Sequence, residues 1–169
     1  MQHIFWLRKG EIAGRSGPSA DIWDLEAIKS GGIASILSVN NGDGVQQSVL
    51  AGLGIAYANI PMTPNAPPLT GDDALCLGKL PAAMKFIGDN LGNGPVLIHC
   101  HSGKDRTAMV MAAYLIQFEG FEVEQAMEEV ITVRPIAFSA AGWMEFGRDV
   151  LQRFNESHAI LQSDAEYSA

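Results

Sequence analysis

The chain has 169 residues, of which 47% are hydrophobic and 18% are charged, and this size and composition suit one globular domain with its own core. Its formal net charge of −8 disfavours nucleic acids and anionic membrane surfaces as partners, because both are bound through basic patches. No segment approaches the roughly 20 apolar residues of a membrane span, and the start lacks the basic region and apolar core of a signal peptide, so we expect a cytoplasmic protein.

The first part of the chain alternates short apolar runs with helical patterns. The runs that predict strands lie at 4–7, 11–15, 33–39 and 54–60. One helical pattern, capped by Ser19 or Asp21, continues to about Lys29, and a second covers 45–53, each typical of a short amphipathic helix. Alternating strands and helices predict an α/β domain with a central, mostly parallel sheet flanked by helices.

A proline-rich stretch follows at 61–71. Proline lacks the backbone donor that a central strand or a helix interior requires, so this stretch predicts a surface loop. Thr70-Gly71-Asp72-Asp73 comes next and reads as a cap followed by acids in the first turn of a helix, where they complement the helix dipole. We expect that helix over 74–91, with an interruption near 78–81.

The stretch 99–107, His-Cys-His-Ser-Gly-Lys-Asp-Arg-Thr, lies between a buried-strand pattern at 95–98 and a helical pattern beginning at Ala108. Backbone N–H groups that converge at a helix N-terminus bind anions. Cys100 lies near this terminus and near Arg106, so we expect it to be a thiolate at pH 7. Arg106 offers two oxygens of a phosphate a planar fork of donors. The stretch therefore predicts a phosphate site with a thiolate nucleophile.

His-Cys, five residues and then Arg-Thr resembles the signature of the cysteine-based protein tyrosine phosphatases, and the short chain resembles their dual-specificity branch. The resemblance implies that family's fold and the hydrolysis of phosphate monoesters by a phosphocysteine intermediate, without a metal or other cofactor. Cys100 attacks phosphorus, and Thr107 hydrogen-bonds the sulfur and stabilises it as a leaving group. The expected phosphate-binding residues are His101, Ser102, Gly103, Lys104, Asp105 and Arg106.

In the resembled family, the loop that corresponds to 61–71 delivers an aspartic acid that protonates the leaving group. The candidates here are Asp72 and Asp73, with Asp73 slightly favoured, and the role of helix cap is an equal alternative for both. The chain departs from the family at 63–65, where some members carry the acid and this sequence has Thr-Pro-Asn.

After the signature, helical patterns cover 108–119 and 123–132, and a last helix, capped by Ser139 or a neighbour, includes Trp143 and Phe154. Arg134-Pro135 resembles a turn of the same family, and we expect the loop 136–141 to border the pocket. Residues 1–155 are predicted to form one catalytic domain. Residues 156–169 form a polar, acidic tail that we expect to be frayed or disordered.

Several alternatives stay open at this point. Cys76 is expected to be a packing residue, and the other possibility is a resolving thiol that forms a disulfide with Cys100. The net charge favours phosphorylated proteins or peptides as substrates, phosphotyrosine above all, whereas Lys104 would support a phosphoinositide phosphatase. A non-catalytic phosphate-binding module is disfavoured because Cys100 and Arg106 are both present. Arg106-Thr107 together with Arg134-Pro135 disfavours a rhodanese or an arsenate reductase. The sequence predicts no oligomeric state.

Overall fold

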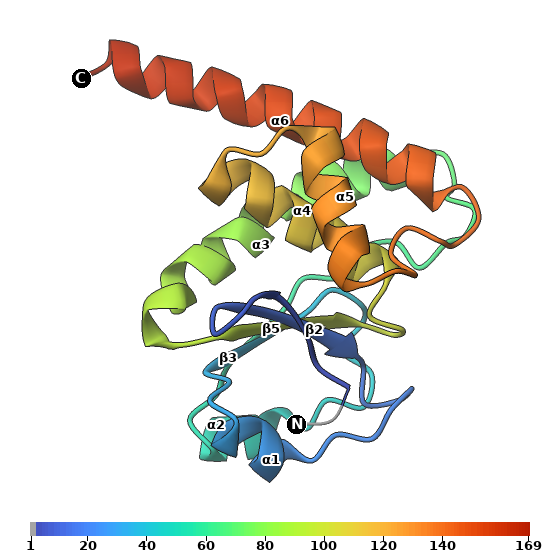
Figure 1. Cartoon of the computed structure of the whole chain (residues 1–169), viewed down its shortest axis with the longest axis vertical. Helices are drawn as coiled ribbons and strands as arrows, with labels where there is room; N and C mark the ends of the chain where they lie inside the picture. Colours follow the sequence, from blue (N-terminus) through green and yellow to red (C-terminus); the bar gives the residue numbers. More distant parts are fainter. Residues whose placement is uncertain (1–2) are drawn as a thin grey trace.

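A five-stranded sheet lies between two layers of helices in the computed structural model, which describes residues 3–169 (Figure 1). Its strand order is β1-β2-β5-β3-β4, with β1 antiparallel to β2 and the other neighbours parallel. The strands are β1 (Phe5–Arg8), β2 (Ile12–Ser16), β3 (Ser35–Ser38), β4 (Ala56–Asn59) and β5 (Val96–Cys100). This arrangement confirms the predicted α/β fold.

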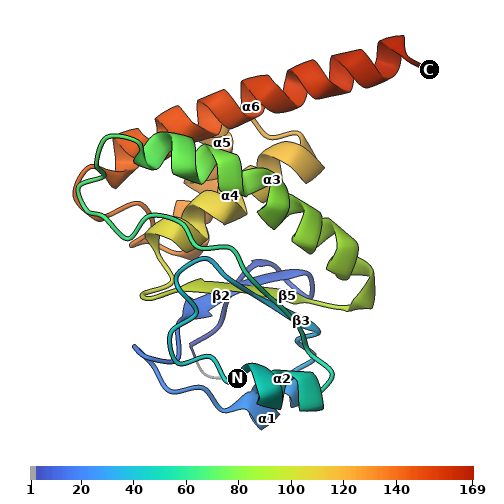
Figure 2. The same ribbon diagram turned by 180° about the vertical axis from the view of Figure 1, so that it is seen from behind.

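Two short helices cover one face of the sheet, and the four longer helices cover the other, as both views show (Figures 1 and 2). The helices are α1 (Leu25–Ser30), α2 (Gln47–Gly52), α3 (Asp72–Asn90), α4 (Asp105–Glu119), α5 (Val123–Val133) and α6 (Trp143–Tyr167), with a 3-10 turn η1 (Leu91–Asn93) after α3. Within residues 3–169, none of these helices has the length and hydropathy needed to cross a membrane.

The central strand β5 is buried on both faces, which explains its continuous apolar sequence. Val96 and Ile98 belong to the large core beneath α3 to α6, whereas Leu97 packs into the smaller core against α1 and α2. Successive side chains of a strand point to opposite faces, so one strand serves both cores. Helix α4, which directly follows the signature loop, is buried along most of its length and anchors that loop to the larger core.

Several helix ends differ from the sequence-based expectations. Asp24, and not Ser19 or Asp21, caps α1, because its Oδ1 accepts the N–H of Ala27 at 2.9 Å, while Asp21 is occupied by an ion pair with Arg15. Helix α3 runs through Pro81 without interruption. Its packed face, which includes Leu80 and Met84, is buried in the core, and such packing outweighs a local helix breaker.

The last helix differs most from expectation. Helix α6 begins after Gly142 and continues to Tyr167, through the stretch predicted to be a frayed or disordered tail. Figure 1 shows its C-terminal part extending beyond the other helices, and this part is largely exposed. A polar sequence without proline or glycine in the stretch 156–167 does not oppose helix propagation, because a turn is added to an already nucleated helix.

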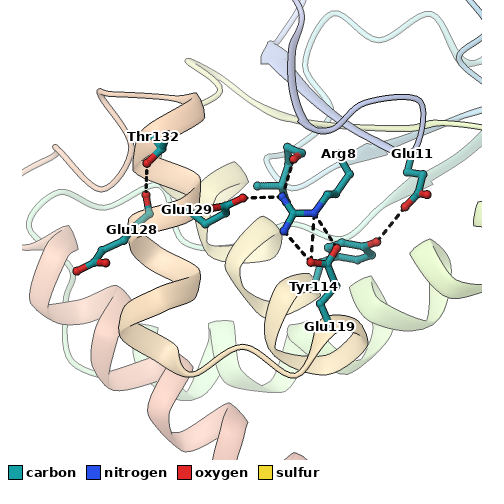
Figure 3. A network of polar contacts seen from close by, with 8 residues as sticks. Arg8, Glu11, Tyr114, Glu119, Glu128, Glu129 and Thr132 are labelled. Carbon is teal, nitrogen blue, oxygen red and sulfur yellow. Dashed lines mark hydrogen bonds and ion pairs between the residues drawn. The ribbon is translucent and has the colours of Figure 1, made fainter.

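Arg8 ties the edge strand β1 to the helical layer (Figure 3). Its Nη2 lies 2.7 Å from Glu119 Oε2 at the end of α4, and its Nη1 lies 2.7 Å from Glu129 Oε1 on α5. Hydrogen bonds to Glu119 are the main reason why the pKa of Arg8 is raised. A guanidinium shared by two carboxylates in this way fixes β1, and hence Phe5, relative to the helices that carry the site.

The parallel strands β2, β3, β4 and β5 have their carboxyl ends at one edge of the sheet, because they share a direction. The connections that leave this edge include the prolines of 61–71 and the signature loop. In α/β proteins, ligands bind outside the carboxyl ends of the strands. The topology thus brings loops that are far apart in sequence together around Cys100.

Candidate active site

Cys100 is the last residue of β5, and its side chain is 2% exposed. The hydroxyl of Thr107, in the first turn of α4, donates a hydrogen bond to Cys100 Sγ at 3.2 Å. Thr107 itself is fully buried, so its hydroxyl has no competing water. The predicted contact between Thr107 and the sulfur is therefore present, and the N-terminus of a fifteen-residue helix lies beside the thiol.

The loop between Cys100 and α4 is held by its carbonyl groups. Arg134 donates from Nη2 to the carbonyl oxygen of Ser102 at 2.9 Å and from Nε to that of Gly103 at 3.1 Å, and Ser16 Oγ also donates to the Ser102 oxygen at 3.1 Å. In a trans peptide the N–H points away from the carbonyl. The N–H groups of Gly103 and Lys104 therefore point away from Arg134, available to an anion.

Position 103 of the signature loop accepts no residue larger than glycine. Its φ of 61° lies in the left-handed region, and a Cβ there would lie 2.5 Å from the carbonyl oxygen of Arg15. The loop thus passes directly against the end of β2. A larger residue would have to push the loop away from the strand, which would move its N–H groups.

His99 supports the loop from beneath and takes no part in the cavity. It is fully buried, and burial lowers its pKa to about 4, so its ring is neutral at pH 7. Its Nδ1 lies 2.9 Å from the carbonyl oxygen of Cys100 and must donate to it, which leaves Nε2 to accept from Ser38 Oγ at 2.5 Å. Tyr57 in turn donates to Ser38 Oγ at 2.8 Å. This series of hydrogen bonds fixes the tautomer of His99.

Lys104 and Asp105 face the loop before α6. Lys104 Nζ donates to Ser139 Oγ at 3.2 Å and lies 3.6 Å from Asp105 Oδ2, while Asp105 Oδ1 accepts the N–H of Ala140 at 3.2 Å. The loop 136–141 was expected to border the pocket. It contacts the signature through Ser139 and Ala140 but contributes no side chain to the cavity described next.

A cavity of about 440 Å³ opens beside Arg106, and we call it the Arg106 cavity. Its walls come from the loops after β2, β3 and β4 and from the signature. The lining residues are Ser19, Asn40, Asn41, Asp43, Pro61, Met62, Pro64, His101 and Arg106. The structure therefore brings Arg106 and His101, two of the predicted site residues, to one cavity at the carboxyl edge of the sheet, whose lining also includes apolar residues.

Asp72 and Asp73, the predicted proton donors, do not line the Arg106 cavity. Asp72 Oδ2 accepts from Asn65 Nδ2 at 3.0 Å and from the N–H of Leu69 at 2.7 Å, and these hydrogen bonds lower its pKa. Asp73 Oδ2 lies 2.7 Å from Arg153 Nη1 on α6, and that contact lowers its pKa too. Gly71 is the N-cap of α3 and no side chain caps it, so both aspartates are first-turn acids. Their bonds to the preceding loop and to α6 favour a structural role over proton donation.

Cys76 lies on α3, fully buried in the same apolar core as Cys100, and both cysteines are free thiols. Burial raises the pKa of Cys76. A thiol with a raised pKa has little thiolate at pH 7 and attacks a disulfide or sulfenic acid slowly. These observations favour packing over a resolving role.

Sequence reasoning missed two residues of the site. Arg134 was noted only for its resemblance to a turn, although it binds the carbonyl groups of the signature loop. Asp43 is absent from the predicted site residues, although it lines the Arg106 cavity. A local signal existed for Asp43, since Asn40-Asn41-Gly42-Asp43-Gly44 directly follows a buried strand, where site residues of α/β domains gather.

The chain is similar to known phosphatases over most of its length. A family model described as "Dual specificity phosphatase, catalytic domain" matches residues 26–148. Dual specificity protein phosphatase 12 of Rattus norvegicus is 27% identical over 122 residues, which cover 72% of this chain and 34% of that protein. Dual specificity protein phosphatase 1 of Arabidopsis thaliana is 37% identical over 57 residues, 34% of this chain and 29% of that protein. The chain spans about a third of the length of these curated relatives.

Solved structures with the same fold cover nearly the whole chain. Tk-PTP in its active form has a TM-score of 0.72 at 20% identity, covering 92% of this chain and 97% of that one. PTPMT1 in complex with PI(5)P has a TM-score of 0.72 at 16% identity, covering 90% and 94%. At such identities these likenesses show a shared fold and nothing more.

Proposed function

This chain belongs to the dual specificity phosphatase family, and we propose that it hydrolyses phosphate monoesters through a phosphocysteine intermediate. The observation that carries the proposal is the Thr107 hydroxyl donating to Cys100 Sγ at 3.2 Å, beside a loop whose carbonyl groups are held by Arg134. A hydroxyl in that place stabilises a thiolate both as nucleophile and as leaving group.

In the proposed reaction, the Cys100 thiolate attacks phosphorus and the ester oxygen leaves with its bonding electrons and a proton. The N–H groups of Gly103 and Lys104, together with the Arg106 guanidinium, bind the equatorial oxygens of the transferring phosphoryl group. Charge on those oxygens is thereby met by fixed donors, which need no reorganisation during the reaction. Water then attacks phosphorus, and the sulfur leaves as a thiolate.

The experiment measures turnover of an aryl phosphate by the wild-type chain and by Cys100→Ser. We expect the variant to lose turnover by several orders of magnitude and still to bind inorganic phosphate, measured by isothermal titration calorimetry. Arg106→Lys keeps the charge but loses the planar fork, so both phosphate binding and rate should fall. EDTA should leave the wild-type rate unchanged. Cys100→Ser activity within about tenfold of wild type would rule out a thiolate nucleophile, because a positioned nucleophile contributes far more.

For the substrate, we propose a phosphotyrosine side chain of a protein or peptide. Pro61, Met62 and Pro64 give the Arg106 cavity an apolar wall, which suits an aromatic ring bearing one phosphate. A phosphoinositide carries further phosphates that need cations. Lys104 could supply one, but it is held by Asp105 and Ser139 and is not among the lining residues.

The substrate class is tested by kcat/KM on phosphotyrosine peptides, phosphothreonine peptides and phosphoinositides, for the wild-type chain and Lys104→Ala. Phosphotyrosine peptides should be hydrolysed fastest by both. PTPMT1, a structural neighbour, was crystallised with PI(5)P, so phosphoinositides are the main alternative substrate class in this test. A phosphoinositide advantage of tenfold or more that Lys104→Ala removes selectively would replace the protein substrate by a lipid.

A further inference from the structure

The proposed reaction needs a group that gives a proton to the leaving oxygen, and the two aspartates suggested by the sequence lie elsewhere. We propose that Asp43, in the loop between β3 and α2, is the catalytic residue that protonates the leaving group and later accepts the proton of the attacking water. This inference rests on the proposed function and names one more residue for the same site.

The composition of the Arg106 cavity carries the assignment. Among the described residues that line it, Asp43 is the only carboxylic acid. The part of the proline-rich loop that reaches the cavity contributes Pro61, Met62 and Pro64, none of which can donate a proton. His101 is the other titratable side chain without a permanent charge, and it directly follows the nucleophile in the chain. A donor must approach phosphorus from the side opposite the sulfur, and Asp43 belongs to the loop after β3 and not to the signature loop.

The loop that carries Asp43 is fixed by its own hydrogen bonds and by close contact with side chains of β4. Asn40 Oδ1 accepts the N–H of Gly42 at 3.0 Å, and Asn41 Oδ1 accepts the N–H of Asp43 at 3.1 Å. Gly42 has a φ of 75°, and a Cβ there would lie 2.6 Å from Asn59 Nδ2 and 2.9 Å from the Tyr57 hydroxyl. The backbone therefore rests directly on β4, which holds Asp43 at the cavity.

The charges around Asp43 also differ from those around the other two aspartates. Asp72 and Asp73 are held by hydrogen bonds or an ion pair, whereas no cation within residues 3–169 forms an ion pair with Asp43. The charged or titratable groups that face it across the cavity are Arg106 from α4 and His101 from the signature loop. Asp43 is exposed, so its carboxyl group is accessible to a substrate bound in the cavity. Asp43 is therefore free of the structural contacts that hold Asp72 and Asp73, and it lies at the cavity where a leaving group would be released.

The proton balance of the two steps is complete with this one carboxyl group. In the first step the S–P bond forms and the P–O ester bond breaks, and the leaving oxygen takes the bonding pair and the proton of Asp43. In the second step the resulting carboxylate accepts a proton from water, whose oxygen forms a bond to phosphorus while the P–S bond breaks. The products are inorganic phosphate, the Cys100 thiolate and a protonated Asp43.

The test is a series of aryl phosphates that differ in the acidity of the phenol released, measured with wild type, Asp43→Asn and Asp89→Asn. Asp89 is an exposed aspartate on α3 in an ion pair with Lys85, so it is a matched control for the loss of one charge. We expect Asp43→Asn to lose about 100-fold or more in kcat on the poorest leaving group and far less on the best, because a stable phenolate departs without a proton. The basic limb of its pH profile should flatten. Asp43→Glu should recover part of the rate.

The outcomes separate this inference from the proposed function. Equal losses for Asp43→Asn across the series, or none, would overturn the role of Asp43 while Cys100-dependent turnover stands. The same leaving-group dependence in His101→Gln, and not in Asp43→Asn, would assign the proton to His101. Full turnover by Cys100→Ser would instead overturn the proposed function. Circular dichroism on each variant shows that the fold is retained, and the ratio of rates within one variant does not depend on its active fraction.

Discussion

Thr107 Oγ1 donates a hydrogen bond to Cys100 Sγ at 3.2 Å, between two side chains that are almost fully buried. Such a bond is worth more to a thiolate than to a phosphorylated sulfur, since the charged acceptor is stronger. It therefore favours the step in which the sulfur leaves phosphorus. Thr107→Val, which keeps the shape and removes the hydroxyl, should slow hydrolysis of the phosphocysteine more than its formation.

Rapid-quench kinetics with an aryl phosphate would show this as a burst of phenol followed by a slower steady state. Wild type is the reference, and Thr132→Val is a matched control, because Thr132 is exposed on α5 and its hydroxyl bonds only the carbonyl of Glu128. A burst no larger than that of wild type, with an unchanged steady-state rate, would mean that the hydroxyl does not assist departure of the sulfur.

Asp72→Asn and Asp73→Asn should leave the leaving-group dependence and the pH profile of kcat as they are in wild type. Their carboxylates bond the loop before α3 and Arg153 and do not line the Arg106 cavity. Their loss should appear as lower thermal stability, since each lowered pKa reflects a favourable contact of the charged form. Steady-state kinetics and thermal unfolding on the same samples distinguish the two effects. A steeper leaving-group dependence in either variant would mean that the mutated aspartate donates the proton to the leaving group.

Arg134→Met should weaken the binding of inorganic phosphate without removing any group that touches it. Arg134 bonds the carbonyl oxygens of Ser102 and Gly103 and stacks its guanidinium 4.9 Å from the centre of the Phe5 ring. Methionine retains packing against Phe5 but makes no hydrogen bonds, so the loop N–H groups lose their fixed direction. Titration calorimetry should show weaker phosphate binding, and Arg134→Lys should restore it only in part because lysine lacks the fork. Unchanged affinity in Arg134→Met would mean that Arg134 does not set the direction of the loop N–H groups.

The sheet and its helices could be predicted because their signals are local. Patterns of period two and period 3.6 identify each element. The apolar run that includes Ile98 predicts a buried strand from its own sequence, and the fold contains that strand. The helix ends that were predicted wrongly depend on distant partners. Asp21 is a good cap by type, but Arg15 from β2 takes its carboxylate, and Asp24 caps α1 instead. The sequence around α1 does not show that Arg15 binds the carboxylate of Asp21.

The residues of the site likewise fall into those that local sequence predicts and those that depend on distant segments. Cys100, Arg106 and Thr107 lie in one continuous stretch, so the sequence alone proposes them together, and their roles stay predictions until they are mutated. Asp43 lines the Arg106 cavity because strands β3 and β5 are neighbours. Arg134 bonds the signature loop because α5 ends beside it. The resemblance led instead to Asp72 and Asp73, because these aspartates directly follow the loop 61–71. The cytoplasmic location also stays a prediction.

The last prediction concerns the buried imidazole of His99 and stability against pH. Burial lowers its pKa from 6.5 to about 4, because a charged ring would lose its hydration. Between these values the unfolded chain binds a proton at His99 and the folded chain does not, so the free energy of unfolding falls as the pH is lowered from about 6.5 to about 4. The loss attributable to this residue should be on the order of 3 kcal/mol.

Urea unfolding of wild type and His99→Asn at several pH values measures that contribution. Asparagine can place an amide N–H where Nδ1 donates to the Cys100 carbonyl, and it does not titrate. All other titratable groups are common to both proteins, so the difference between their unfolding free energies isolates His99. We expect wild type to be the more stable at pH 7 and its advantage to shrink by pH 4. A constant difference over this range would mean that the pKa of His99 is the same in the folded and the unfolded chain. The folded ring would then take up a proton on Nε2 at low pH, and the hydrogen bond with Ser38 Oγ would run in the opposite direction.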